Sequence, residues 1–157
     1  MRSDKTFQVR PIGFVRSARQ EPIDDQWDGI ASAIELDPAQ FRPDALSGLD
    51  AFSHIEVVYY FDRVPEDEIR TVARHPRGRE DWPSVGIFAQ RGKGRPNRIG
   101  VTFCRLLNIS GLEIAVRGLD AINGTPVLDI KPVMKGFLPR DDIREPEWAT
   151  EIMKDYW

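Results

Sequence analysis

The sequence predicts a mainly β protein with a barrel-like arrangement of strands. Short segments rich in β-branched and aromatic residues recur along most of the chain. Turn signals, Ser110-Gly111 and Asn123-Gly124, separate several of these segments, and helical patterns are few. Many short strands joined by tight turns are typical of β-barrels and sandwiches. Because the chain has 157 residues and no linker or internal repeat, we expect one domain over residues 1–157.

About seven segments have the composition of strands. Pro11 lies inside the first of them and favours an edge or a bulge, because proline has no N–H to donate to a ladder. The third contains an unbroken run from Val57 to Phe61, which predicts a central strand covered on both faces. In chain order the predicted strands are residues 7–16, 30–37, 52–62, 85–91, 99–109, 112–120 and 125–133.

Helices are predicted in the connections and at the end of the chain. Residues 65–75 start with a proline and acids and finish with basic residues, which favours one surface helix. Asp37 followed by Pro38 predicts a short capped turn. In the tail, Trp148, Ile152 and Tyr156 recur every four residues, so a C-terminal helix is expected to dock against the body of the protein.

Composition narrows the class of protein. The net charge of −3 and the pI near 5.5 give no overall attraction to nucleic acid, so binding to a polyanion would need a local patch. The single cysteine, Cys104, has apolar neighbours and is expected to be a reduced core thiol. The first ten residues lack the apolar core of a signal peptide, and no apolar run is long enough to span a membrane, so a cytoplasmic setting is expected.

Two familiar kinds of active site find no support in the residue spacing. His54 and His75 have no cysteine or histidine at ligand distance in sequence, so no metal site is expected. Ser53 and His54 are adjacent in a predicted strand and would point to opposite faces, which argues against a serine hydrolase triad.

Positive charge is concentrated in the segment from Arg91 to Gly100, "RGKGRPNRIG". It is not a P-loop, because the upstream glycine and the Ser or Thr after Gly-Lys are missing. It is not a dinucleotide fingerprint, because no helix is predicted to follow it. Gly92 and Gly94 would permit close backbone approach and positive φ, while the cations could hold RNA or a small anion. A solvated basic hairpin turn is the alternative. A second polar cluster, Gly118 to Pro132, surrounds a tight turn and could merely shape it.

These two segments, "FAQRGKGRPNRIGVTFCRLL" and "VRGLDAINGTPVLDIKP", resemble the TrmO family, also called TsaA or YaeB-like proteins. The resemblance extends to "IGFVRS", "LDAFSHIEVVYYFDR" and "PEWATEIMKDYW", and so spans nearly the whole chain. It implies a single-sheeted β-barrel with a few short helices, usually a homodimer. It also implies binding of S-adenosylmethionine and methylation of the exocyclic amine of threonylcarbamoyladenosine, next to the anticodon of tRNA. Two alternatives stay open: a methyltransferase with another substrate, and a non-catalytic module that binds S-adenosylmethionine or a nucleotide.

The resemblance also assigns residues by matching positions. Asp62 and Asp120 are candidates for the group that accepts the proton of the amine. Lys93, Arg95, Asn97 and Arg98 would face the substrate. Cofactor binding is assigned to Gln26, Asp62, Arg63, Arg91, Val101, Gly118, Leu119 and Asp120. The chain departs from the family pattern at Gly92-Lys93-Gly94, at Arg98 and at Asn123, which bear on the choice of substrate.

Overall fold

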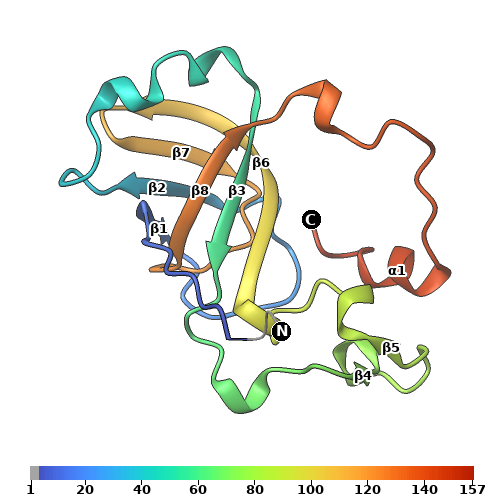
Figure 1. The fold of residues 1–157 in the computed structure, drawn as a ribbon. Helices are drawn as coiled ribbons and strands as arrows, with labels where there is room; N and C mark the ends of the chain where they lie inside the picture. The colour runs from blue at the N-terminus through green and yellow to red at the C-terminus, as the bar shows by residue number, and fades with distance from the viewer. Residues whose placement is uncertain (1–3) are drawn as a thin grey trace.

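A closed barrel of six antiparallel strands forms the body of the protein in a computed structural model, which describes residues 4–157 (Figure 1). The strand order around the barrel is β1-β2-β7-β6-β3-β8. The prediction of a mainly β barrel is therefore confirmed. The strands are β1 (Gly13–Ser17), β2 (Ala31–Leu36), β3 (His54–Tyr60), β6 (Ile99–Ser110), β7 (Glu113–Arg117) and β8 (Pro126–Pro132).

Alternating burial along the strands creates the core. β-Branched side chains suit a pleated surface that is covered on one side, and they fill the interior here. Buried residues alternate with exposed or half-buried ones along β1 and β3. As predicted, β3 is a central strand, and it lies between β6 and β8. The prediction that both of its faces are covered holds only in part, because its outward side chains are half-buried. The most deeply buried aliphatic residues are Ile34, Ile55, Val57, Ile114, Val116, Leu119 and Val127.

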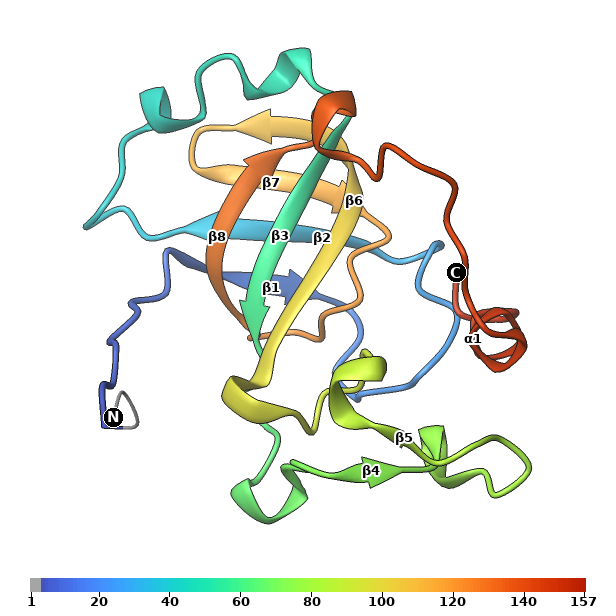
Figure 2. The same ribbon diagram turned by 45° about the vertical axis from the view of Figure 1, so that its right-hand side comes forward.

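β6 is long and changes partner along its length. Its first half pairs with β3, from Tyr60↔Ile99 to His54↔Arg105. From Arg105 onward it pairs with β7, with a register shift between Leu106 and Asn108. The loop that joins β7 to β8 runs along the first half of β6 (Figure 2). One edge of this half is therefore outside the β7 ladder and lies beside a loop.

An arm of irregular structure leaves the barrel between β3 and β6. It holds a small two-stranded sheet, β4 (Ala73–Arg74) and β5 (Val85–Gly86). The predicted helix over residues 65–75 is wrong, since only Glu66–Glu68 forms a 3₁₀ turn. Thr71 and Val72 are β-branched, and the Arg70 N–H donates to the Gly94 carbonyl (2.9 Å) instead of a helical partner. The arm is thus hydrogen-bonded to residues 91–100, which we call the basic segment.

The predicted strand over residues 85–91 is also much shorter in the structure. β5 covers two residues, and a 3₁₀ turn, Ile87–Ala89, follows. The Gln90 side-chain amide donates to the carbonyls of Arg74 and Val85 (3.1 and 2.8 Å). Gln90 is buried, and its amide satisfies carbonyls that a longer ladder would otherwise have paired.

The helices are short. α1 (Glu147–Ile152) is the predicted C-terminal helix, and Tyr156 of the predicted stripe lies beyond its end. The turn predicted after Asp37 is present, with the Ala39 N–H donating to the Asp37 carboxylate (2.9 Å). β1 begins at Gly13, so Pro11 lies before the strand. Further 3₁₀ turns in the described residues are Pro43–Leu46, Leu49–Ala51, Pro76–Gly78, Pro96–Arg98 and Lys135–Phe137.

Helix length also bears on membranes. From residue 4 to the C-terminus, no helix is both long and apolar enough to cross a bilayer.

Candidate functional site

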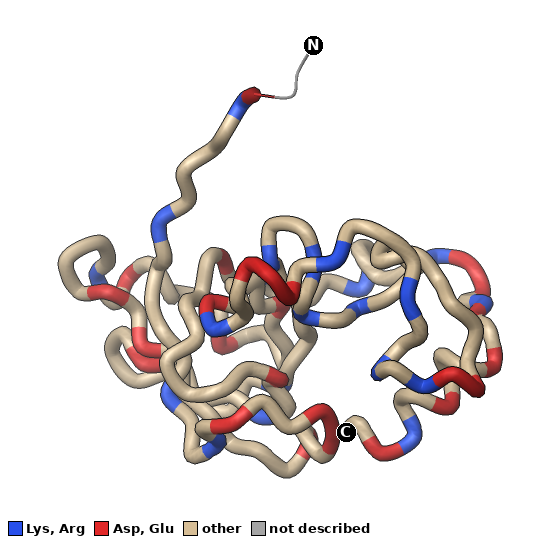
Figure 3. The backbone as a smooth tube through the Cα atoms, turned by 90° about the horizontal axis from the view of Figure 1, so that it is seen from below, with Lys and Arg blue, Asp and Glu red and all other residues tan. Residues whose placement is uncertain are grey.

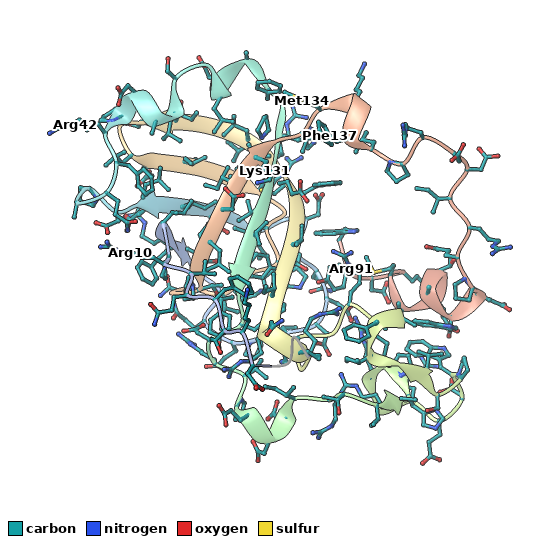
Figure 4. The ribbon with its side chains drawn as sticks, in the orientation of Figure 1. Arg10, Arg42, Arg91, Lys131, Met134 and Phe137 are labelled. Atoms are coloured by element: carbon teal, nitrogen blue, oxygen red, sulfur yellow. The ribbon has the colours of Figure 1, made fainter. Side chains whose placement is uncertain are left out.

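The free edge of β6 presents backbone groups beside the loop. The Leu106 N–H donates to the Ser53 carbonyl (3.0 Å), so the alternation of an antiparallel ladder turns the N–H and C=O groups of Val101 and Phe103 away from β3. Arg91 Nη2 donates to the Val101 carbonyl (2.9 Å). The predicted pair Arg91 and Val101 is therefore brought together, and the exposed guanidinium lies between the barrel and the tail (Figure 4).

The Asp120 carboxylate is held by three hydroxyl groups. Tyr59 donates to Oδ1 (2.7 Å), Thr102 donates to the same oxygen, and Tyr156 donates to Oδ2. Tyr59 and Thr102 are buried. Burial, with the nearby Asp120 charge, raises the pKa of both tyrosines well above the ordinary value of 10.0, so both stay protonated donors. We call Tyr59, Thr102, Asp120 and Tyr156 the Asp120 cluster.

Two glycines give this cluster its shape. A Cβ at Gly100 would lie 2.5 Å from the Tyr59 ring and 2.8 Å from that of Phe61, so only glycine leaves room for these rings. The two rings pack edge to face with centroids 5.4 Å apart, which fixes the direction of the Tyr59 hydroxyl. Gly118 adopts φ 78°, a left-handed conformation that glycine favours. An ideal Cβ there would lie 3.6 Å from Asp28 Oδ1, so the Asp28 carboxylate also faces this turn.

The C-terminal tail closes one side of the site. The N–H of Gln26 donates to the Asp155 carbonyl (3.0 Å), and that of Trp27 donates to the Tyr156 carbonyl (2.9 Å). Gln26 has φ 64°, which is uncommon for a non-glycine residue and turns the chain toward the tail. The Trp27 ring is buried under the Arg19 guanidinium, 4.2 Å from the ring centroid. The predicted cofactor residue Gln26 therefore borders the Asp120 cluster through the tail.

Arg63 and Asp62 have different surroundings. Arg63 donates to the carbonyls of Gln20 and Asn123 (both 3.1 Å) and so fastens the turn before β8 to the loop after β1. Asn123, one of the departures from the family pattern, accepts the Ser17 N–H with its Oδ1 (3.0 Å). Asp62 is exposed, and its carboxylate makes no hydrogen bond within residues 4–157. It stands outside the Asp120 cluster.

The basic segment is folded onto the arm by its own arginines. Arg95 donates to the Gln90 carbonyl (2.7 Å). Arg98 donates to the Val64 carbonyl (2.6 Å) and lies over the Tyr60 ring, 5.1 Å from its centroid. Each guanidinium has further N–H groups that can donate to a partner. Several cationic residues gather on this side of the molecule (Figure 3).

The expected backbone freedom of the basic segment is found at other residues. Positive φ occurs at Asn97 (60°) and Arg98 (50°), while Gly92 and Gly94 are not among the residues with positive φ. Close approach is confirmed at Gly94, where a Cβ would lie 2.6 Å from the Glu68 carbonyl oxygen. Lys93 is half-buried, and its ammonium has no ion pair in the described chain. It is the segment's one described cation whose side chain makes no hydrogen bond.

Cys104 fits its expected role, but the expectation that Ser53 and His54 point to opposite faces is wrong: Ser53 lies just before β3, and its Oγ is within hydrogen-bond distance of His54 Nδ1 (2.7 Å). Cys104 is a free buried thiol, and burial, with the Asp120 charge, raises its pKa to about 12, which keeps it unreactive. His75 Nδ1 contacts the Trp82 carbonyl (2.7 Å) in the arm. No group of three His, Cys, Asp or Glu residues that could hold a metal ion occurs in the described part of the chain.

Sequence reasoning missed part of the site. Tyr59 and Thr102 have the composition of ordinary strand residues, and nothing in their spacing indicates that they donate hydrogen bonds to a carboxylate. The spacing of Tyr156 predicts only a place in an apolar stripe and indicates no role for its hydroxyl. Asp28, two residues after Gln26, carries no sequence signal for a site. A tyrosine in an otherwise apolar stripe is the one cue that was available, because a buried tyrosine hydroxyl needs a partner.

Comparison with known proteins places the chain in a family. Residues 15–137 match the family described as tRNA-methyltransferase O N-terminal domain. A protein of Methanothermobacter thermautotrophicus named probable S-adenosyl-L-methionine-binding protein is 37% identical over 134 residues, which cover 83% of this chain and 92% of that protein. The tRNA (adenine(37)-N6)-methyltransferase of Escherichia coli is 33% identical over 138 residues, which cover 82% of this chain and 58% of the enzyme.

A solved structure agrees with these sequence matches. The crystal structure of TrmO from Pseudomonas aeruginosa superposes with a TM-score of 0.75 at 28% identity, covering 94% of this chain and 64% of that one. The chain thus spans nearly all of the archaeal relative and less than two thirds of the solved bacterial protein. The resemblance noted in the sequence is confirmed, and this chain belongs to the TrmO family.

Proposed function

We propose that this protein binds S-adenosylmethionine and transfers its methyl group to the exocyclic amine of threonylcarbamoyladenosine, next to the anticodon of tRNA. The observation that carries the proposal is the Asp120 cluster beside the free edge of β6. Relatives of the same family are named as S-adenosylmethionine-binding proteins and as tRNA (adenine(37)-N6)-methyltransferases. Their names support the donor and the acceptor together.

The residues of the site suit the chemistry of this cofactor. A carboxylate has about four acceptor positions, and three hydroxyls use most of those of Asp120, which leaves room for one donor from a ligand amine or ribose. The exposed Arg91 guanidinium can pair with a ligand carboxylate. The outward backbone groups of Val101 and Phe103 can bond the edge of an adenine, and Gly118 allows close backbone approach.

Bound S-adenosylmethionine supplies an electrophilic methyl group on a sulfonium. The task of the chain is then to bind both partners, align them and exclude water, which accounts for much of the catalysis of such transfers. We propose that the Asp120 cluster holds the donor and that Lys93, Arg95, Asn97 and Arg98 meet the RNA. The amine also loses a proton. Asp120 already accepts hydrogen bonds from three hydroxyl groups, so the exposed Asp62 is the better of the two candidates to accept the proton.

The first experiment measures cofactor binding and then transfer. S-adenosylmethionine should raise the melting temperature, because a ligand selective for the folded state stabilises it. Labelled cofactor and bulk tRNA from cells lacking the gene should then give labelled tRNA, and mass analysis of its nucleosides should show methylated threonylcarbamoyladenosine. Binding without transfer would point to the non-catalytic module, and label on another nucleoside would point to another substrate. No thermal shift at millimolar cofactor would refute the proposal.

We propose a homodimer in the cytoplasm as the working form. Support comes from large apolar side chains exposed on the barrel and after β8, including Phe103 (50% exposed) and Phe137 (87%), the latter labelled in Figure 4 together with Met134. Apolar surface of this kind favours a protein contact. Sedimentation equilibrium should give twice the 17.9 kDa chain mass. A mass equal to one chain at micromolar concentration would contradict the dimer.

A further inference from the structure

The last residues of the chain reach back from the arm to the barrel. We call residues 146–157, which include α1, the C-terminal strap. On the arm, Trp82 Nε1 donates to the Glu151 carboxylate (2.8 Å), and Arg79 lies 3.5 Å from the same group. The strap then turns inward, and the C-terminus lies between the barrel and α1 in Figure 1. The match to the family description ends at residue 137, before the strap, whose sequence PEWATEIMKDYW is part of the resemblance noted above.

Backbone contacts hold the end of the strap at the site. The Gln26 and Trp27 N–H groups donate to the carbonyls of Asp155 and Tyr156. The Tyr156 ring packs edge to face on Trp157, with centroids 4.9 Å apart. These contacts leave the Tyr156 side chain half-buried and its hydroxyl directed at Asp120. The hydroxyl is therefore brought to the site by an anchored main chain rather than by a loose tail.

We infer that Tyr156 is a positioning residue for methyl transfer, which orients the Asp120 carboxylate toward the methyl donor. The inference rests on the proposed function. Tyr59 and Thr102 both bond Oδ1, from inside the barrel, whereas Tyr156 is the only described residue that bonds Oδ2. Each carboxylate oxygen has about two acceptor positions, so Tyr59 and Thr102 use those of Oδ1, and Tyr156 uses one of the two on Oδ2. Tyr156 thereby determines which side of Oδ2 remains open to a donor from the ligand.

The orientation matters because the remaining acceptor position is scarce. With three of about four positions used, a ligand donor can be accepted in one direction only. Burial raises the pKa of Tyr156, so its hydroxyl does not ionise next to the carboxylate at neutral pH. The strap therefore supplies a permanent donor, and cofactor affinity should depend on Tyr156.

A matched pair of variants tests this. Tyr156→Phe removes the hydroxyl and keeps the ring, while Tyr60→Phe removes a hydroxyl that makes no hydrogen bond in the described chain. By calorimetry, Tyr156→Phe should weaken S-adenosylmethionine binding roughly tenfold, as expected for loss of a hydrogen bond to a charged group. Tyr60→Phe should match the wild type. In turnover assays, the KM for S-adenosylmethionine should rise more than kcat falls, whereas general unfolding would lower the active fraction without changing KM.

A double-mutant cycle shows whether Tyr156 acts through Asp120. If it does, Tyr156→Phe should have little further effect on cofactor affinity in an Asp120→Asn background. Multiplying effects in the double variant, or unchanged affinity in Tyr156→Phe, would overturn the inference while the proposed function stood. A wild-type protein that binds no S-adenosylmethionine would refute the proposed function itself, and the positioning role with it. Amide exchange at Trp27, compared across the variants, would show directly whether the strap stays anchored.

Discussion

The Asp120 cluster and the basic segment hold their charges in opposite ways. The Asp120 carboxylate is fixed by three hydroxyls, two of which belong to buried residues. The arginines of the basic segment each donate to one backbone carbonyl and remain partly open to solvent. A fixed, shielded charge suits a small ligand that must sit in one orientation. Arginine side chains that are held by one hydrogen bond and keep other N–H groups free suit a large polyanion, which contacts several of them at once.

The largest expected effect comes from removing the central charge. Asp120→Ala should abolish measurable S-adenosylmethionine binding and lower the free energy of unfolding by about 2 kcal/mol, because buried hydroxyls lose their acceptor. Urea unfolding and calorimetry measure the two effects. Asp62→Ala is the control for stability, since that carboxylate is exposed and unbonded in the described chain. Equal destabilisation by both variants would show that the Asp120 cluster is not a structural unit.

A second prediction compares the effect of adding a methyl group at one glycine in each of the two regions. Gly100→Ala should cost about 2 kcal/mol of stability, because its Cβ would clash with the buried Tyr59 ring and displace the cluster. Gly92→Ala is the matched variant in the basic segment, where the nearest atom is Arg74 Nη2 at 3.1 Å, the end of a flexible side chain. It should be nearly neutral in thermal unfolding. Similar losses for both glycines would contradict the packing around Tyr59.

The third prediction concerns alkaline pH. Burial raises the pKa of Tyr59 far above its unfolded value of 10.0, so above pH 10 the unfolded state loses a proton that the folded state keeps. Stability from this group is complete below pH 10 and should fall by about 1.4 kcal/mol per pH unit above it. Urea unfolding at pH 9 and pH 11 should show a smaller decline for Tyr59→Phe than for the wild type. An identical decline would mean that the Tyr59 hydroxyl is not shielded.

Sequence patterns predicted the barrel well and the irregular regions poorly. The strand at Ile99 and the run from Val57 are rich in β-branched and aromatic residues, which predicts both strands, although the unbroken run does not reveal that burial alternates along β3. The prediction of a helix over residues 65–75 is wrong. The order of acidic and basic residues there favours a helix, but a backbone hydrogen bond from Arg70 to the distant Gly94 determines the conformation. Such a partner, distant in sequence, leaves no local pattern.

The site shows the same division between motif and geometry. Arg91, Val101 and Asp120 came from the family motifs, and the structure places Arg91 on Val101 and Asp120 beside β6. No motif indicated that Tyr59 and Tyr156, far apart in the chain, would share one carboxylate. That meeting depends on barrel closure and on the path of the strap, which only the assembled fold reveals.

The smallest expected effect lies in the basic segment, at Lys93. Lys93→Ala removes a cation that makes no hydrogen bond or ion pair in the described chain, so stability and S-adenosylmethionine affinity should match the wild type. The affinity for tRNA should fall severalfold, and the slope of log K against log salt should decrease by somewhat under one, as for loss of one phosphate contact. Fluorescence anisotropy between about 50 and 200 mM salt measures the slope.

Arg91→Ala is the reciprocal variant. The Arg91 guanidinium bonds the edge of β6, so its loss should weaken cofactor binding and leave the tRNA salt slope nearly unchanged. If both variants changed cofactor affinity equally, the cofactor site and the RNA surface would be one region, and the contrast between fixed and open charge would not hold.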